Sequence, residues 1–273
     1  WLCYRRSLDR LAGFGLPAPR MLAEQSGWMT WLRRGPWILA ESFLDGMTMD
    51  RVSMDEATAA ILGTSIGRLH RNTAPFFEWG SKRYAPEKYR ERCLAMTRRR
   101  IEQIASDVGK VSSADDSSSG ADVERQLHQI GRWLSDRMER WSTPDQFSFI
   151  HTELDGDDMI MLDESREVAC IDIEKMRFNH RGLDLVMIER WLRRQEGEER
   201  AEMLMEKFFV TYWQLVGDGA KVAWREEAPI FKMIWLLSRW ASRVKAARRS
   251  NGDTERREIE NLRREISQLM AEA

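Results

Sequence analysis

The carboxylates between residues 149 and 174 are the side chains of this sequence best placed to do chemistry. Glu153 opens a predicted loop, Asp158 lies five residues on at its exit, and Asp172 follows a predicted strand. A β-hairpin over residues 159–172 would bring its two ends together, so we expect Asp158 and Asp172 to be neighbours. Mg²⁺ binds through one or two carboxylates, with water and phosphate oxygens completing its shell. The segment is therefore suited to hold a divalent cation and to handle the proton of a hydroxyl group.

The residue pattern of this loop resembles the catalytic core of the aminoglycoside phosphotransferase and choline kinase-like superfamily. The loop of that family has the form His-Gly-Asp-Leu-His-x-x-Asn. Here His151 and Leu154 match the pattern. Glu153 stands where the catalytic Asp is expected, and Asp158 stands where the metal-binding Asn is expected.

Segments on both sides of the loop fit the same resemblance. Asp172 and Glu174 match an Asp-x-Glu element at the end of a strand pair, and Asp184 matches the Asp that opens the next helix. The resemblance runs from about residue 8 to residue 191. Its upstream parts are a Pro-rich segment, a hinge strand and a Leu-x-x-Leu-His helix, at residues 16–19, 39–46 and 62–70.

The resemblance implies an ATP-dependent kinase that phosphorylates a hydroxyl group of a small molecule. Glu153 would act as the base or orient the acceptor, Asp158 and Asp172 would hold Mg²⁺, and His151 and Asp184 would support the loop. Residues 171–177 also resemble lipopolysaccharide core kinases, so the implied acceptors are an amino sugar, a choline-like cation or a sugar lipid. The other implied contacts are Glu41 and Phe43 for the nucleotide, and Asp155, Glu174 and Lys175 for the acceptor.

Three departures from the family pattern support an alternative, a pseudokinase or binding module without catalysis. Glu153 lengthens the catalytic arm by one methylene, and misplacements near 1 Å can cost roughly a hundredfold in rate. Asp158 replaces Asn and adds negative charge to the loop. The sequence shows no Gly-rich loop and no strand-borne Lys before a helix Glu. Because the chain begins with Trp1 and not with Met, it is expected either to be a fragment whose phosphate clamp lies upstream or to bind nucleotide poorly.

The elements expected to position the loop form an α+β, protein-kinase-like fold. Residues 1–46 are predicted to be a truncated small lobe and hinge, with a helix over 2–12 and an antiparallel hairpin over 20–24 and 36–44. Residues 47–273 are predicted to be a mainly helical lobe that carries the catalytic hairpin. Ser53 and Glu56 form a predicted capping box, and Asp184 is a predicted N-cap. The other predicted helices cover residues 86–108, 122–141, 183–194, 198–216, 227–249 and 254–271.

Composition restricts the partners and the location of the chain. Its 43 basic and 44 acidic side chains give a net charge of −1, which argues against recruitment of nucleic acid. No apolar run approaches the roughly 18 residues of a transmembrane helix. Three widely spaced cysteines indicate free thiols in the cytoplasm. The last helix, with Ile259, Leu262, Ile266 and Leu269 on one face, is expected to dock on its own domain.

Overall fold

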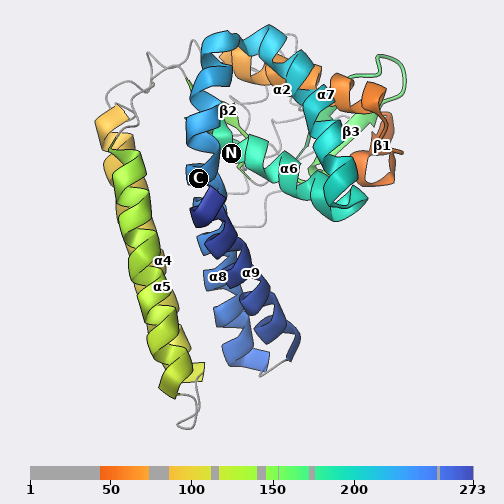
Figure 1. Cartoon of the computed structure of the whole chain (residues 1–273). Coiled ribbons are helices and arrows are strands. Elements are labelled where there is room, and N and C mark those ends of the chain that lie inside the picture. Colours follow the sequence, from red (N-terminus) through yellow and green to blue (C-terminus); the bar gives the residue numbers. More distant parts are fainter. Residues whose placement is uncertain are drawn as a thin grey trace, which may run out of the picture. The chain divides into compact units, whose positions relative to one another are not determined.

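The computed structural model describes residues 44–73, 86–111, 117–139, 146–152, 154–171, 176–250 and 253–272. These residues are mainly helical, with five short strands in two antiparallel sheets (Figure 1). The chain divides into two compact units. Unit 1 combines residues 1–78 with 145–221, and unit 2 combines residues 79–144 with 222–273. The predicted boundary between residues 46 and 47 falls within unit 1, and the predicted helix over 2–12 and nearly all of the hairpin over 20–44 lie outside the described residues.

The strands of unit 1 form one three-stranded sheet and one two-stranded sheet. Strand β3 (Met159–Leu162) pairs with β4 (Val168–Cys170), in the register Met159↔Cys170, which confirms the predicted catalytic hairpin. Strand β1 (Gly46–Thr48) pairs with the other edge of β3. In the second sheet, β2 (Phe147–Ile150) pairs with β5 (Arg177–His180). The sequence did not reveal β5, because its four residues show no apolar alternation.

Unit 1 also contains three helices: α2 (Glu56–Thr73), α6 (Gly182–Glu196) and α7 (Glu198–Val216). Helix α2 packs against strands of both sheets, β2 and β4. Helices α2 and α7 lie side by side (Figure 1). Their backbones approach closely at Gly63, where a Cβ atom would lie 2.2 Å from the carbonyl oxygen of Phe208. The predicted capping box at Ser53 is wrong. Asp55 caps α2 instead, because its Oδ1 accepts a hydrogen bond from the backbone N–H of Thr58 at 2.7 Å.

The described part of unit 2 consists of helices: α4 (Pro86–Val111), α5 (Ser117–Met138), most of α8 (Asp218–Ser250), and α9 (Asp253–Glu272). Two predicted starts are wrong. Helix α5 begins five residues earlier than predicted, since its Ser-rich first turn is helical. Helix α8 begins directly after Gly217, nine residues earlier than predicted, and continues through Pro229. A proline inside a helix removes one hydrogen bond, and here Ile230 and Phe231 are buried beside it.

The last helix docks within unit 2, as predicted from its apolar face. Leu262 and Ile266 of α9 are buried. The side chain of Gln126 in α5 donates to the carbonyl oxygen of Arg263 at 3.0 Å, and Arg243 of α8 pairs with Glu258. Among the described helices, none is long and apolar enough to cross a membrane.

Candidate active site

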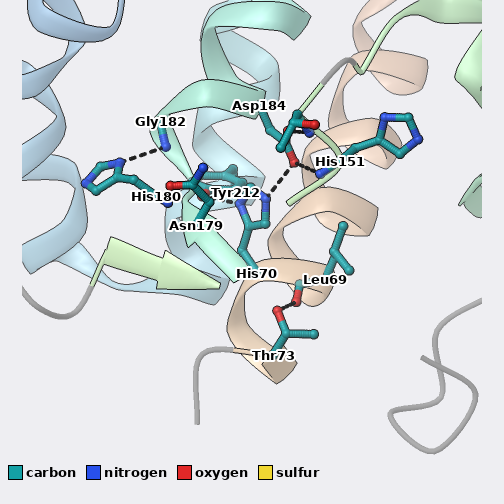
Figure 2. Close-up of polar contacts among 10 residues, drawn as sticks. Leu69, His70, Thr73, His151, Asn179, His180, Gly182, Asp184 and Tyr212 are labelled. Atoms are coloured by element: carbon teal, nitrogen blue, oxygen red, sulfur yellow. Dashed lines mark hydrogen bonds and ion pairs between the residues drawn. The ribbon is translucent and has the colours of Figure 1, made fainter. Parts of the chain in front are cut away.

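A single buried carboxylate, Asp184, fixes the start of the predicted catalytic loop. Its Oδ2 accepts from the backbone N–H of His151, and its Oδ1 accepts from the backbone N–H of Thr152, both at 3.0 Å (Figure 2). Asp184 lies in the first turn of α6 and is fully buried. It is not the N-cap of that helix, a position that Arg181 occupies without a side-chain cap. Its carboxylate faces the loop, so both of its oxygens hold loop backbone.

The backbone of Thr152 is strained at the position just before Glu153. Its φ of 72° lies in the left-handed region, which is unfavourable for a β-branched residue and costs on the order of 1–3 kcal/mol. Hydrogen bonds from backbone N–H groups to a charged acceptor are worth about 1.5–3 kcal/mol each. The two bonds to Asp184 are therefore strong enough to hold this conformation, and strained backbone of this kind is concentrated at functional sites.

His151 ties the loop start to the end of the catalytic hairpin. Its Nε2 lies 2.7 Å from the carbonyl oxygen of Ile171, the residue before Asp172. A carbonyl oxygen only accepts, so Nε2 carries the hydrogen in this contact. The imidazole is fully buried. It therefore joins the strand end that leads into the Asp-x-Glu element to the first residue of the loop.

The exit of the loop is a 3-10 turn, η5 (Gly156–Asp158), closed by a capping box. The Asp155 side chain accepts from the N–H of Gly156 at 2.8 Å, and the Asp158 side chain accepts from the N–H of Asp155 at 3.2 Å. Asp158 is only 7% exposed. Its carbonyl oxygen accepts from the N–H of Ile171 at 2.9 Å. This bond puts Asp158 beside the residue that precedes Asp172, in line with the predicted closure of the hairpin.

Side chains of α6 and of the turn η2 (Met49–Arg51) hold η5 from outside. Arg194 of α6 forms an ion pair with Asp155. Trp191, also in α6, donates from Nε1 to Oδ1 of Asp50 at 2.7 Å. Gly156 lies against this bond, and a Cβ atom there would lie 1.9 Å from Oδ1 of Asp50 and 2.3 Å from Nε1 of Trp191. Only glycine fits at residue 156 in this arrangement.

Two further buried side chains lie behind Asp184. The Nε2 of His70, in α2, is 3.2 Å from Oδ2 of Asp184, and its Nδ1 is 2.8 Å from the hydroxyl of Tyr212, in α7.

Cys170 lies at the end of β4, and burial raises the pKa of its thiol to about 12. Cys93 and Cys170 are both free, as predicted, and both are buried, so neither thiol is ionised near neutral pH.

Unit 1 brings together four of the predicted site residues: His151, Asp155, Asp158 and Asp184. The others lie outside the described residues: Glu41, Phe43, Glu153, Asp172, Glu174 and Lys175. Within the described ranges, no group of three or more His, Cys, Asp or Glu side chains is arranged to hold a metal ion. The buried carboxylate of Asp158 is a hard oxygen donor of the kind that Mg²⁺ prefers, and its neighbour in the hairpin precedes Asp172.

Sequence reasoning missed the residues that position the loop from a distance. Asp50, Trp191 and Arg194 belong to no recognised motif, and their contacts join segments about 140 or 40 residues apart. Tyr212 is one of several aromatic residues in α7, and no motif distinguishes it from the others. The one available signal was Gly156, because a glycine inside a run of acidic residues suggests a close approach of other atoms.

Comparison with known proteins supports the fold and gives the family. An amicoumacin kinase, solved with AMP-PNP, Ca²⁺ and Ami, superposes with a TM-score of 0.62 at 14% identity, covering 97% of this chain and 76% of its own. Plasmodium vivax ethanolamine kinase gives a TM-score of 0.56 at 10% identity, with 99% and 72% coverage. Spectinomycin phosphotransferase gives 0.52 at 12% identity, with 85% and 70% coverage. These similarities show the kinase-like fold.

No curated protein matches the sequence. The model of the phosphotransferase enzyme family matches residues 2–218, which include the whole of the loop, its hairpin and Asp184 on α6. A match of this extent, together with the kinase-like fold, confirms the resemblance seen in the sequence. The chain belongs to the phosphotransferase enzyme family.

Proposed function

We propose that this protein transfers the γ-phosphoryl group of ATP to a hydroxyl group of a small molecule. The observation that carries the proposal is the bond pair from Asp184 to the N–H groups of His151 and Thr152. It fixes the backbone immediately before Glu153, in the loop where the family places its catalytic carboxylate. Positioning and electrostatics account for most of the catalysis in phosphoryl transfer, so a rigid loop is the feature that matters.

In the proposed reaction the acceptor oxygen forms a bond to the γ-phosphorus while the bond from that phosphorus to the β–γ bridging oxygen breaks. Glu153 orients the hydroxyl and takes its proton, and ADP leaves with the bridging oxygen. Asp158 and Asp172 would hold a divalent cation, whose chemistry is to neutralise charge on the phosphates. The amicoumacin kinase complex contains an ATP analogue and Ca²⁺, and Mg²⁺ is the cation we propose here.

The remaining contacts follow from the family pattern. Glu41 and Phe43 would hold the nucleotide, and Glu174 and Lys175 would contact the acceptor. Asp155 was a candidate for the same role, but its side chain caps η5 and pairs with Arg194, so contact with an acceptor would have to compete with both interactions. We propose an amino sugar, a choline-like cation or a sugar lipid as the acceptor. Use of ATP and the free thiols suit the cytoplasm.

The test is ³¹P NMR of ATP, Mg²⁺ and each acceptor class with the purified chain and two variants at residue 153. Glu153→Asp restores the shorter arm of the family pattern, and Glu153→Gln removes the base while keeping the length. We expect acceptor-dependent formation of ADP and a phosphate ester, faster with Glu153→Asp and slower with Glu153→Gln. Equal rates for all three forms would contradict the role of Glu153.

The length of Glu153 favours one second candidate, a pseudokinase that binds nucleotide without turnover. The extra methylene moves the carboxylate by roughly 1.5 Å, enough to abolish useful alignment. This candidate requires a rise in melting temperature with ATP and Mg²⁺ but no ester with any acceptor in wild type. Turnover that appears only in Glu153→Asp would assign the loss to this methylene, and ester formation by the wild type would exclude the candidate.

A further inference from the structure

A hydrogen-bonded chain of three buried side chains extends from the catalytic loop into the helical core of unit 1. The chain runs from Asp184 on α6 to His70 on α2 and then to Tyr212 on α7 (Figure 2). It therefore joins three helices to the backbone of His151 and Thr152. The family pattern includes a Leu-x-x-Leu-His helix, but Tyr212 belongs to no part of that pattern.

The side chains of Asp184, His70 and Tyr212 are all 0% exposed. Water therefore does not reach them to replace a lost partner, and a buried polar group without a partner is costly. The ring of Tyr212 is already packed: it stacks on Phe208 at 5.5 Å and meets Trp213 edge-on at 4.7 Å. Only the hydroxyl group of Tyr212 is left for a separate role, and it points to Nδ1 of His70.

The chemistry of the partners fixes the direction of these hydrogen bonds. Asp184 already accepts two backbone N–H groups, and a carboxylate only accepts, so the Nε2 of His70 carries a hydrogen. In a neutral imidazole Nδ1 is then an acceptor, and the Tyr212 hydroxyl is the donor. Burial lowers the pKa of His70, and the charge of nearby Arg181 lowers it further, although Asp184 opposes both. Burial raises the pKa of Tyr212, so its hydroxyl keeps its proton.

We propose that Tyr212 and His70 are positioning residues for the catalytic loop. Asp184 fixes the neutral Nε2–H tautomer of His70, Tyr212 orients the imidazole ring by donating to Nδ1, and His70 in turn orients Asp184 so that each carboxylate oxygen faces one loop N–H. The inference deepens the proposed phosphotransferase function and rests on it for its kinetic consequence. The tautomer itself does not depend on turnover.

The first experiment is long-range ¹H–¹⁵N NMR of the histidine side chains in the full chain. The sequence has only four histidines, and His70→Gln identifies the signal of His70. We expect a neutral His70 with its hydrogen on Nε2 in the wild type and in Tyr212→Phe, and a changed ¹⁵N shift of Nδ1 in Tyr212→Phe, because that nitrogen loses its hydrogen bond. A hydrogen on Nδ1 in the wild type, or an unchanged spectrum in Tyr212→Phe, would overturn the proposal. This readout stands even if no acceptor is ever phosphorylated.

The second experiment measures kcat and KM for ATP, with Thr73→Val as the matched control. Thr73 is also on α2 and buried, and its hydroxyl donates to the carbonyl oxygen of Leu69, in the same helix, at 2.6 Å. We expect Tyr212→Phe to lower kcat about tenfold with little change in KM, as the loss of one buried hydrogen bond implies. Thr73→Val should leave both constants unchanged. Equal effects of the two variants would show a packing role only.

A conservative replacement guards against a variant that simply fails to fold. Glutamine at residue 70 can still donate to Asp184 and accept from Tyr212, whereas leucine fills similar space and does neither. We expect His70→Gln to keep most of kcat and His70→Leu to lose it by at least the factor seen in Tyr212→Phe. Equal activity in the two variants would contradict the positioning role.

Discussion

The two ends of the catalytic loop are held by different kinds of interaction. The start, at His151 and Thr152, is held by the fully buried Asp184, which belongs to a network without access to water. The exit, at Asp155, is held by a capping box and by an ion pair with Arg194, whose side chain is 63% exposed. At the start of the loop, no water can replace Asp184 as the acceptor of the two N–H groups. At the exit, water can replace Arg194 as the partner of Asp155.

This difference indicates where precision is required. The start leads directly into Glu153, the proposed base, and it carries a strained residue that needs firm support. The exit carries Asp158, a proposed ligand of a cation that brings its own water and phosphate ligands. The water ligands of such a cation can move with a displaced protein ligand, whereas a base must stay aligned with its hydroxyl, so a softer support is sufficient there.

Replacing Asp184, which holds the start of the loop, should give the largest effect. Asp184→Asn keeps the shape of the side chain but puts an amide NH₂ against one of the two backbone N–H groups that now donate to the carboxylate. We expect a loss of about 3 kcal/mol in the free energy of unfolding, measured by urea titration, because buried groups lose a charged partner. Asp157→Asn makes the same change of charge at an exposed side chain of the loop itself and should cost almost nothing. Similar losses in the two variants would erase the distinction between buried and exposed support.

Filling the close approach at Gly156 should give the next largest effect, because it disturbs the more rigid part of the exit. Gly156→Ala puts a methyl group against Asp50 and Trp191 and should cost about 2 kcal/mol, the usual range for overpacking. Gly120→Ala is the control, since no atom lies within 4 Å there. In an Asp50→Ala background Gly156→Ala should cost less free energy of unfolding, because the contact with Asp50 is gone. The cost should stay above zero, because the methyl group still meets Trp191. An unchanged cost would mean that Asp50 does not support the loop.

The pH dependence of stability should report on the buried support at the start of the loop, without a substitution in the loop itself. The pKa of His70 is lower in the folded protein than its ordinary value of 6.5, so the unfolded chain binds more protons below that pH. Stability that is present above pH 6.5 should therefore be lost as the pH falls, by at most about 1.4 kcal/mol per pH unit. The slope should be missing in His70→Gln. Parallel pH profiles for the two proteins would contradict a buried neutral His70.

The exposed ion pair should give the smallest effect. Arg194→Ala should lower the free energy of unfolding by less than about 1 kcal/mol, and less still in high salt. Asp155→Ala should cost more, by about 1 kcal/mol, because it also removes the cap on the N–H of Gly156. Equal costs for the two variants in high salt would show that the cap contributes nothing.

The sequence predicted the catalytic hairpin, most helices and the neighbourhood of Asp158 and the end of β4, because each follows from local pattern and spacing. It misplaced the starts of α2, α5 and α8: Asp55 and not Ser53 caps α2, the Ser-rich first turn of α5 is helical, and α8 begins at Asp218 and continues through Pro229. The resemblance to the kinase family implied that His151 and Asp184 support the loop, but the side chains behind Asp184 could not be predicted. His70, Asp184 and Tyr212 come from three helices, and only the packing of those helices brings them together.

The most direct test of the proposed site is calorimetric titration of ATP, with and without Mg²⁺, into wild type, Asp158→Ala and Asp158→Asn. The asparagine variant keeps an oxygen ligand, restores the residue of the family pattern and can still accept from the N–H of Asp155. We expect Mg²⁺-dependent binding of ATP in wild type and in Asp158→Asn, and its loss in Asp158→Ala. Binding that needs neither Mg²⁺ nor an oxygen ligand at residue 158, or no binding in any form, would contradict the assignment of this loop as a phosphotransferase site.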